Sequence, residues 1–143
     1  MEKNNMTLSF KSFSQNESFA RNVVSCFALN LNPSLSEISD IKTAVSEAVT
    51  KCIVHGYSKT IGDILIECEV VDNQLHINIV DKGVGIDDVD KVLQPFYTTK
   101  PDQERSGMGF TIMKSFMDEV KIFSKIGEGT RVYMKIIIKN DEN

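Results

Sequence analysis

A carboxylate and two glycines follow directly after a β-rich run, at Asp81, Gly83 and Gly85. Glycines at this spacing permit a tight turn and let the backbone approach a ligand closely. The Asp81 carboxylate could accept a hydrogen bond from an exocyclic amine of such a ligand. An ordinary Asp/Gly turn would use the same residues, so this motif alone leaves both interpretations open.

A second glycine segment ends a polar stretch, where Arg105, Ser106, Gly107 and Gly109 stand at the expected beginning of a helix. The backbone N–H groups at a helix N-terminus point outward, and the helix dipole favours an anion there. Arg105 adds a donor that can bind a phosphate with two hydrogen bonds. The spacing matches neither the GxxxxGK[ST] phosphate loop nor the GxGxxG dinucleotide motif. A phosphate site and a simple glycine-rich helix start both fit these residues.

An acid and a base lie one helical turn apart at Glu47 and Lys51, in the order that favours an ion pair. An exposed pair of this kind is worth only roughly a few tenths of a kcal/mol. The neighbouring Ala48, Val49 and Cys52 indicate that one flank of this helix is buried. A carboxylate at such a border is a candidate general base.

The composition is that of one ordinary globular domain spanning residues 1–143. Of these residues 41% are hydrophobic and 25% are charged, which suffices for a single core without disulfides or a structural metal. Sixteen Lys and Arg against twenty Asp and Glu give a net charge of −4. A general nucleic-acid binder would carry a basic excess, so that class of function is disfavoured.

The cysteines at positions 26, 52 and 68 are too far apart for a metal finger, and their odd number argues against a disulfide framework. Because all of them sit in apolar runs, we expect them to be small buried hydrophobic residues. No apolar run is long enough to span a membrane, and the polar N-terminus is followed by no signal-peptide core. A cytoplasmic location without a membrane partner is therefore expected.

The first elements that position these residues are a strand and a helix. Alternation of apolar and polar residues predicts a half-buried strand over residues 7–13, with Leu8, Phe10 and Phe13 inward. A helix should follow over residues 17–31, begun by a capping box of Ser14 and Glu17. The apolar stripe of this helix consists of Phe19, Val23, Phe27 and Leu31.

A second helix should begin at a capping box of Ser34 and Glu37 and stop at Gly56, because only glycine freely adopts the left-handed conformation expected there. The later elements expected are strands over residues 61–71, 74–80, 120–124 and 130–139, a short helix over 87–93, a polar loop over 95–106 and a helix over 107–116. This order predicts the α+β class: a two-layer α/β sandwich whose mixed, mostly antiparallel sheet is covered by helices on one face. We expect residues 6–139 to be ordered.

Three of the segments resemble the N, G1 and G2 boxes of the GHKL superfamily of ATPases and kinases. The matching runs are Glu47-Ala-Val with His55-Gly-Tyr, then Asp81-Lys-Gly-Val-Gly-Ile, and Gly107-Met-Gly-Phe. Residues 14–21, 96–101 and 104–113 narrow the resemblance to the sporulation anti-sigma factors, small serine kinases that also sequester a sigma factor. The resemblance covers residues 6–139.

The resemblance implies the Bergerat ATP-binding fold, with ATP or ADP held between the helices and a lid over residues 100–106. Asp81 would receive the adenine amino group, Glu47 would take the proton from the attacking serine hydroxyl, and Arg105 would lie on the terminal phosphate. Glu47 and Arg105 are thus the implied catalytic residues. The other implied nucleotide-binding residues are Lys51, Gly83, Gly85, Lys100, Ser106, Gly107, Gly109 and Thr130.

One position departs from the family. The family's Asn four residues after the Glu is a Mg²⁺ ligand, and Lys51 stands in its place. A protonated Lys has three donors and no acceptor, so it cannot ligate the metal. Lys51 would either contact the phosphates as a point charge or pair with Glu47 and lower its basicity. Both outcomes predict nucleotide affinity without full kinase activity.

The resemblance also implies two protein partners, namely sigma factor F and an anti-anti-sigma factor that is phosphorylated on a serine. It further implies a homodimer formed through the first strand and the first helix. Glu17 and Arg21, an i, i+4 pair on that helix, would dock the partners, although a solvated helix face is the plainer alternative. The expected function is an ATP-dependent serine kinase that inhibits a sigma factor. A sigma sequestrator with impaired catalysis and a related stress-response anti-sigma kinase remain alternatives.

Overall fold

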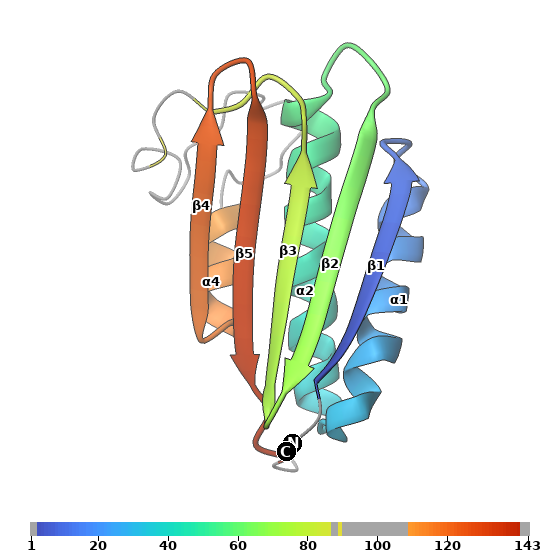
Figure 1. Cartoon of the computed structure of the whole chain (residues 1–143), viewed down its shortest axis with the longest axis vertical. Coiled ribbons are helices and arrows are strands. Elements are labelled where there is room, and N and C mark those ends of the chain that lie inside the picture. The colour runs from blue at the N-terminus through green and yellow to red at the C-terminus, as the bar shows by residue number, and fades with distance from the viewer. Residues whose placement is uncertain (1–2, 87–88, 90–108, 141–143) are drawn as a thin grey trace.

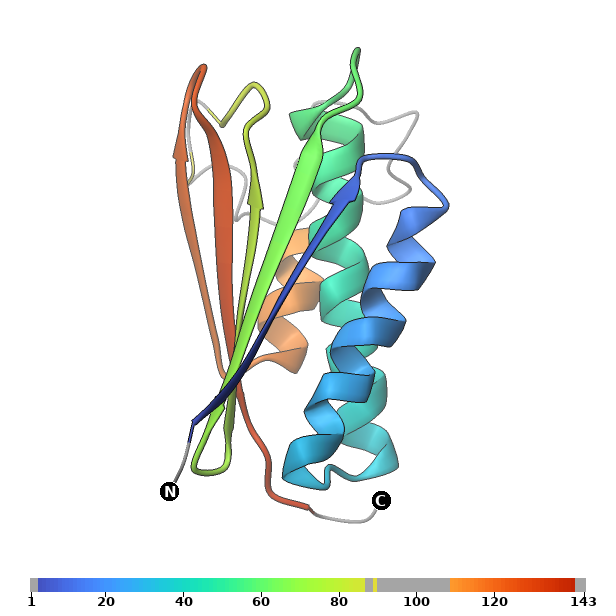
Figure 2. The ribbon, with the colours of Figure 1, turned by 45° about the vertical axis from the view of Figure 1, so that its right-hand side comes forward.

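The computed structural model describes residues 3–86, 89 and 109–140. These residues form two layers, with α1, α2 and α4 all on one face of a sheet (Figures 1 and 2). The elements are β1 (Asn4–Lys11), α1 (Asn16–Ala28), a 3₁₀ turn (Leu29–Leu31), α2 (Leu35–Lys51), a π-helical turn (Cys52–Gly56), β2 (Asp63–Val71), β3 (Gln74–Asp81), α4 (Gly109–Phe116), β4 (Glu119–Lys125) and β5 (Gly129–Ile137).

The sheet has five strands in the order β1-β2-β3-β5-β4, and each neighbouring pair is antiparallel. The expected two-layer α+β fold is therefore confirmed, and the strands are antiparallel throughout the described residues rather than mixed. Along β3 every second side chain is buried against the helices: Leu75, Ile77, Ile79 and Asp81. Because side chains alternate between the two faces of a strand, Asp81 at the last residue of β3 lies on the same face as the three apolar side chains before it.

The central helix α2 packs over this apolar row. Its buried residues recur at the three- and four-residue spacing of a helix face: Ile41, Ala44, Val45, Ala48 and Val49. Cys52, the next residue of the same stripe, is 3% exposed. The face of α2 that forms the core therefore runs up to the end of β3 that carries Asp81.

The capping box of Ser34 and Glu37 is confirmed. The Ser34 hydroxyl accepts from the Glu37 N–H at 3.1 Å, and the Glu37 carboxylate accepts from the Ser34 N–H at 2.9 Å. The same carboxylate also accepts from the N–H groups of Lys139 and Asn140. Glu37 therefore joins the start of α2 to the chain after β5.

Glu37→Gln is expected to lower the free energy of unfolding at pH 7 by about 1 kcal/mol. Partial burial alone raises the pKa of Glu37, but the hydrogen bonds from Lys139, Ser34 and Asn140 outweigh it and hold the pKa below its ordinary value. A depressed pKa contributes stability that is present above the unfolded-state value, about 4.3, and is lost as the pH falls through the folded-state value. Urea melts at pH 7 and pH 3 should therefore show the difference between wild type and variant shrinking at the lower pH. A difference that stays constant, or one matched by the exposed-site control Glu67→Gln, would contradict this role.

Helix α1 differs from its expectation at the first turn. It begins at Asn16, and no side chain caps it, so the expected capping box of Ser14 and Glu17 is wrong. Gln15 is already in the helical conformation, and the Asn16 N–H is taken by the Phe13 carbonyl at 3.0 Å. The Glu17 carboxylate instead accepts from Arg21.

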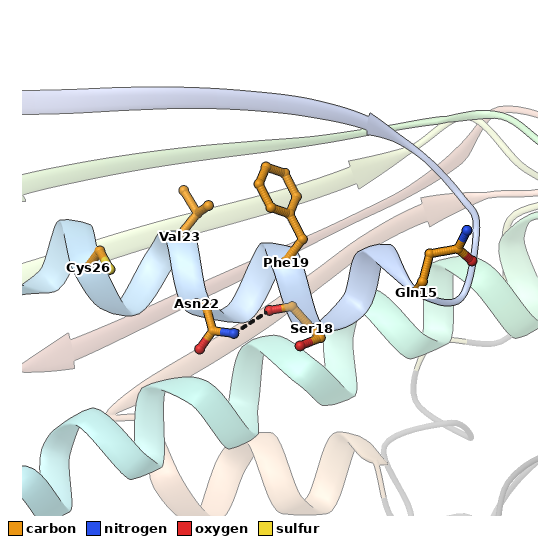
Figure 3. Close-up of a pocket in the computed structure, with 6 residues that line it drawn as sticks. All are labelled: Gln15, Ser18, Phe19, Asn22, Val23 and Cys26. Carbon is orange, nitrogen blue, oxygen red and sulfur yellow. Dashed lines mark hydrogen bonds between the residues drawn. The ribbon is translucent and has the colours of Figure 1, made fainter.

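The predicted inward stripe of α1 is only partly right, because Phe27 and Leu31 pack against the core but Phe19 does not. Phe19 is 49% exposed, whereas the residues packed inward are Ala20, Val24, Ser25 and Ala28. These small residues allow α1 and α2 to pack closely, because interaxial distance follows side-chain size at the contact. The stripe containing Phe19 and Val23 faces away from the core (Figure 3).

Strand β1 begins earlier and ends earlier than predicted. It stops at Lys11, after which Ser12 is buried and its hydroxyl accepts from the Gly62 N–H at 3.0 Å. Because the alternation ends there, Phe13 turns outward and is 46% exposed, contrary to expectation. None of the helices within the described residues is long and apolar enough to cross a bilayer.

Candidate functional site

The candidate site lies at the end of the molecule where β3 ends, α2 and its π-helical turn end, and α4 begins (Figure 1). The chain after β3 is held there by backbone hydrogen bonds. The Val84 N–H donates to the Gly56 carbonyl at 3.1 Å, and the Gly127 N–H donates to the Val84 carbonyl at 2.8 Å. The Ile86 N–H donates to the Ser124 hydroxyl at 2.7 Å. Residues 82–86 are thereby fixed between the end of α2 and the β4–β5 turn.

Asp81 is the buried carboxylate of this site and is 4% exposed. Its Oδ1 accepts from the Gly83 N–H at 2.9 Å, and the carboxylate also accepts from the Cys52 thiol and the Thr130 N–H. Burial raises the pKa of Asp81 above its ordinary value, although these hydrogen bonds oppose the shift. Thr130 is its partner across the β3–β5 ladder. The structure thus brings the predicted residues Asp81 and Thr130 together.

Gly56 ends the second helix as expected, but not for the expected reason. The α-helix stops at Lys51 and continues as a π-helical turn, in which the Tyr57 N–H donates to the Cys52 carbonyl at 2.9 Å. Gly56 is absent from the residues with positive φ. A Cβ at Gly56 would lie 2.9–3.0 Å from the Asp81 carboxylate. A glycine is needed here because the carboxylate packs against the backbone, and π-helical turns of this kind often mark functional sites.

The glycines after Asp81 approach protein backbone. A Cβ at Gly83 would collide with the backbone of Gly56, and one at Gly85 would collide with the Lys125 carbonyl. Gly85 also has a φ of +79°, which favours glycine. The close approach that was predicted toward a ligand is therefore seen here as packing between segments of the chain, while contact with a nucleotide stays a prediction.

Glu47 and Lys51 converge on the first residue of α4. A Cβ at Gly109 would lie 3.2 Å from Glu47 Oε2, 2.5 Å from Lys51 Cε and 3.1 Å from Lys51 Nζ. Lys51 Nζ also lies 5.3 Å from the centre of the Phe110 ring, within the range of a cation–π interaction. The structure therefore places a carboxylate, an ammonium group and the N-terminal end of α4 together at the site.

The remaining predicted site residues, Lys100, Arg105, Ser106 and Gly107, lie outside the described residues. The same holds for the polar loop over residues 95–106 and for the short helix over residues 87–93, apart from Val89. The roles expected of them stay predictions.

Three polar residues of the site were missed by the sequence reasoning. Tyr57 accepts from the Lys82 N–H and donates to the Asp63 carbonyl, each at 2.7 Å. Ser124 lies 2.7 Å from the Thr130 hydroxyl. Cys52 was predicted only as a buried hydrophobic residue. Burial and the neighbouring Asp81 raise the pKa of its thiol, which stays protonated and donates to that carboxylate.

Of the other two cysteines, one is buried as predicted and one is exposed. Cys68 is buried on β2, and burial raises the pKa of its thiol to about 12. Cys26 is exposed on the outer side of α1, so its predicted burial is wrong. The reason is the rotation of α1 that also turns Phe19 outward.

Comparison with known proteins agrees with this geometry. Residues 14–136 match the family described as the histidine kinase-like ATPase domain. Among solved structures, the histidine kinase domain of the blue-light activated histidine kinase from Erythrobacter litoralis EL346 superposes with a TM-score of 0.55 at 16% identity, covering 85% of this chain and 61% of that one. At this identity the likeness shows the fold alone. Fold and site together define a histidine kinase-like ATPase domain.

Relatives in sequence narrow this class. An anti-sigma F factor from Caldanaerobacter subterraneus subsp. tengcongensis is 56% identical over 94% of both chains. One from Thermoanaerobacter sp. (strain X514) is 52% identical over 97% of both, and one from Clostridium novyi (strain NT) is 49% identical over 99% of this chain and 100% of that one. The chain belongs to the anti-sigma F factor family, which confirms the resemblance in its motifs.

Proposed function

We propose that this protein binds and inhibits sigma factor F and, as an ATP-dependent serine kinase, phosphorylates a serine of an anti-anti-sigma factor. The observation that supports this most is the buried Asp81 carboxylate at the end of β3, framed by Gly56, Gly83 and Thr130. It lies in a chain that is 56% identical to an anti-sigma F factor over nearly its whole length. A buried acceptor of this kind suits the exocyclic amine of adenine.

The proposed roles follow from the positions of the side chains. Asp81 accepts from the adenine amino group, because its oxygens are the buried acceptors on the inner face of the sheet at this end. Glu47 is half-buried beside Gly109, and as general base it takes the proton from the attacking serine hydroxyl. Arg105 is the proposed donor to the terminal phosphate. The bond from the γ-phosphorus to the bridging oxygen of ATP breaks as the bond to the serine oxygen forms.

Phosphate transfer from radiolabelled ATP to a purified anti-anti-sigma factor tests this proposal. The wild type is expected to label the substrate, and Glu47→Gln is expected to lower the rate by about 100-fold, since general-base catalysis typically contributes about that factor. Binding of ATP to the same variant should stay within about threefold, a change of less than 1 kcal/mol. Absence of both ATP binding and sigma factor binding in the wild type would overturn the proposal.

A second candidate function is a nucleotide-bound sigma sequestrator with impaired catalysis. Lys51 favours it, because its ammonium group stands where the family has a Mg²⁺ ligand, and both Lys51 Nζ and Glu47 Oε2 lie within 3.2 Å of the Cβ position of Gly109. Comparing the transfer rates of the wild type and Lys51→Asn separates the candidates. A wild-type rate equal to or above that of the variant supports full kinase activity.

A homodimer is part of the proposal, and its surface is the edge formed by β1 and α1. Among the residues that the structure describes, β1 has a neighbouring strand only on its β2 side, and a free strand edge can pair with another strand. Beside it, the outer side of α1 carries a shallow groove (Figure 3). The groove is lined by Gln15, Ser18, Phe19, Asn22, Val23 and Cys26.

Phe19→Glu is expected to convert the dimer to a monomer at micromolar concentration, because a charge would replace an exposed apolar side chain at the centre of this groove. Light scattering after size-exclusion chromatography gives the mass. Phe123→Glu is the matched control, since Phe123 is 56% exposed on β4, the other edge strand. A dimeric Phe19→Glu variant, or a monomeric control, would exclude this surface.

Arg21→Ala is expected to weaken binding of sigma factor and anti-anti-sigma factor by about 10-fold while ATP affinity stays unchanged. Arg21 donates to the Glu17 carboxylate at 3.0 and 3.1 Å on α1. The two side chains are partly exposed. Calorimetry with each partner and with ATP measures the three affinities. Equal losses in all three would indicate misfolding and count against a docking role.

A further inference from the structure

Lys51 places a positive charge inside the proposed nucleotide site, and the inference drawn from it rests on the proposed function. Its Nζ lies 3.1 Å from the Cβ position of Gly109 and 5.3 Å from the Phe110 ring centre. The side chain therefore reaches from the end of α2 across to the first turn of α4. Phosphates bound at this end of the molecule would lie in the field of that ammonium group.

The magnesium ion implied by the fold family does not fit the residues that the structure describes. Mg²⁺ needs oxygen ligands in near-octahedral geometry. In nucleotide sites Mg²⁺ is usually held by one or two protein oxygens, and the phosphates and waters supply its other ligands. At the position of the family's ligand, Lys51 offers donors only, and its charge repels a cation.

We propose that the Lys51 ammonium group is the resident cation of the nucleotide site, so that ATP and ADP bind without a divalent ion. Lys is a compact point charge that binds phosphate in this way in other proteins. Glu47 Oε2 is 3.2 Å from the same Gly109 Cβ position and is the competing partner for that charge. A phosphate group, which carries more negative charge than a carboxylate, displaces Glu47 from Lys51 when nucleotide binds.

Calorimetric titration of ATP into the folded protein tests this inference in two buffers, one with Mg²⁺ and one with EDTA. The wild type is expected to show affinities in the two buffers that agree within about threefold. Affinity that falls about 10-fold or more in EDTA would overturn the role of Lys51, while the proposed function would stand. Absence of saturable binding in both buffers would overturn the proposed function itself.

Two variants of Lys51 sharpen the result. Lys51→Met keeps the length of the side chain without its charge and is expected to lower ATP affinity in EDTA by about 10-fold or more. Lys51→Asn supplies a side-chain oxygen and is expected to bind ATP about 10-fold more tightly with Mg²⁺ than with EDTA. If the affinity of Lys51→Met for ATP in EDTA equals that of the wild type, Lys51 interacts with Glu47 and not with the phosphates, which contradicts the inference.

Lys42→Asn is the matched control for the charge change. Lys42 lies on the same helix, about 13 Å from Lys51 along the axis at 1.5 Å per residue. The affinity of the Lys42→Asn variant for ATP should equal that of the wild type in both buffers. If Lys42→Asn and Lys51→Met lose ATP affinity equally, the loss comes from the change in net charge and not from the position of Lys51, and the inference is overturned.

Discussion

Asp81→Asn is expected to lower the affinity for ATP and ADP by about 100-fold, the upper part of the range for losing a hydrogen bond to a charged group. The Asn oxygen would be retained by the donors that surround Asp81 in the protein, namely the Gly83 N–H, the Cys52 thiol and the Thr130 N–H. Its NH₂ group would then face the adenine amino group, donor against donor. Calorimetry with both nucleotides measures the loss.

Stability separates this loss from misfolding. Burial raises the pKa of Asp81 in the folded state, so the folded protein binds the proton more tightly than the unfolded chain does. A carboxyl group with a raised pKa reduces stability as the pH rises through the window between the two values. Asp81→Asn removes that cost and should unfold at pH 7 at the same or a higher urea concentration than wild type. Full ATP affinity in a folded Asp81→Asn variant would contradict the assignment, as would an equal loss in the exposed control Asp63→Asn.

Gly129→Ala is expected to lower the free energy of unfolding by about 3 kcal/mol or more, from left-handed backbone strain plus a steric clash. Gly129 has a φ of +94°, and a Cβ there would collide with the Asp81 carbonyl. Since the obstacle is backbone in the neighbouring strand, it cannot move aside as a flexible side chain would. The end of β3 would have to shift, and ATP affinity should fall with it. Urea melts and ATP titrations measure both effects.

Gly127→Ala is the matched control in the same turn. Gly127 has a φ of +81°, but a Cβ there would meet nothing within 4 Å. Only the strain of the left-handed backbone remains, so the free energy of unfolding is expected to fall by about 1 kcal/mol. ATP affinity should stay unchanged. Equal losses in the two variants would mean that the packing of Gly129 against Asp81 contributes nothing.

The parts of the fold that were predictable from the sequence are those fixed by local chemistry. Ser34 and Glu37 are three residues apart and satisfy each other's backbone N–H groups, so the start of α2 can be read directly. The strands predicted over residues 61–71 and 74–80 leave only Asp72 and Asn73 for the turn between them, and Asp72 adopts a φ of +55° there. Strand β3 was predicted within one residue of its bounds, because its β-rich composition is a local signal.

The orientation of α1 could not be predicted in the same way. Phe19 and Val23 share a four-residue spacing, and so do Ala20 and Val24 one step further round the helix. Periodicity accepts both stripes, and larger side chains favoured the wrong one. The choice is made by packing against α2, where small residues fit and Phe19 does not.

The candidate site shows the same division. The place of Asp81 at the end of β3 was predictable because it follows a β-rich run directly, while its role toward a nucleotide stays a prediction. Its contact with the Cys52 thiol joins segments far apart in the sequence, and it depends on the π-helical turn that carries the inward face of α2 past Lys51. No local pattern at Cys52 or Gly56 signals that contact.

The central claim, that the Asp81 carboxylate recognises adenine through its amino group, is tested most directly by comparing ATP with inosine triphosphate. The two nucleotides differ only at the base, where inosine carries an oxygen in place of the amino group. Calorimetry should show saturable ATP binding and inosine triphosphate binding that is weaker by about 100-fold, because an oxygen would face a buried carboxylate. Equal affinity for the two nucleotides, or no heat with ATP, would contradict the account.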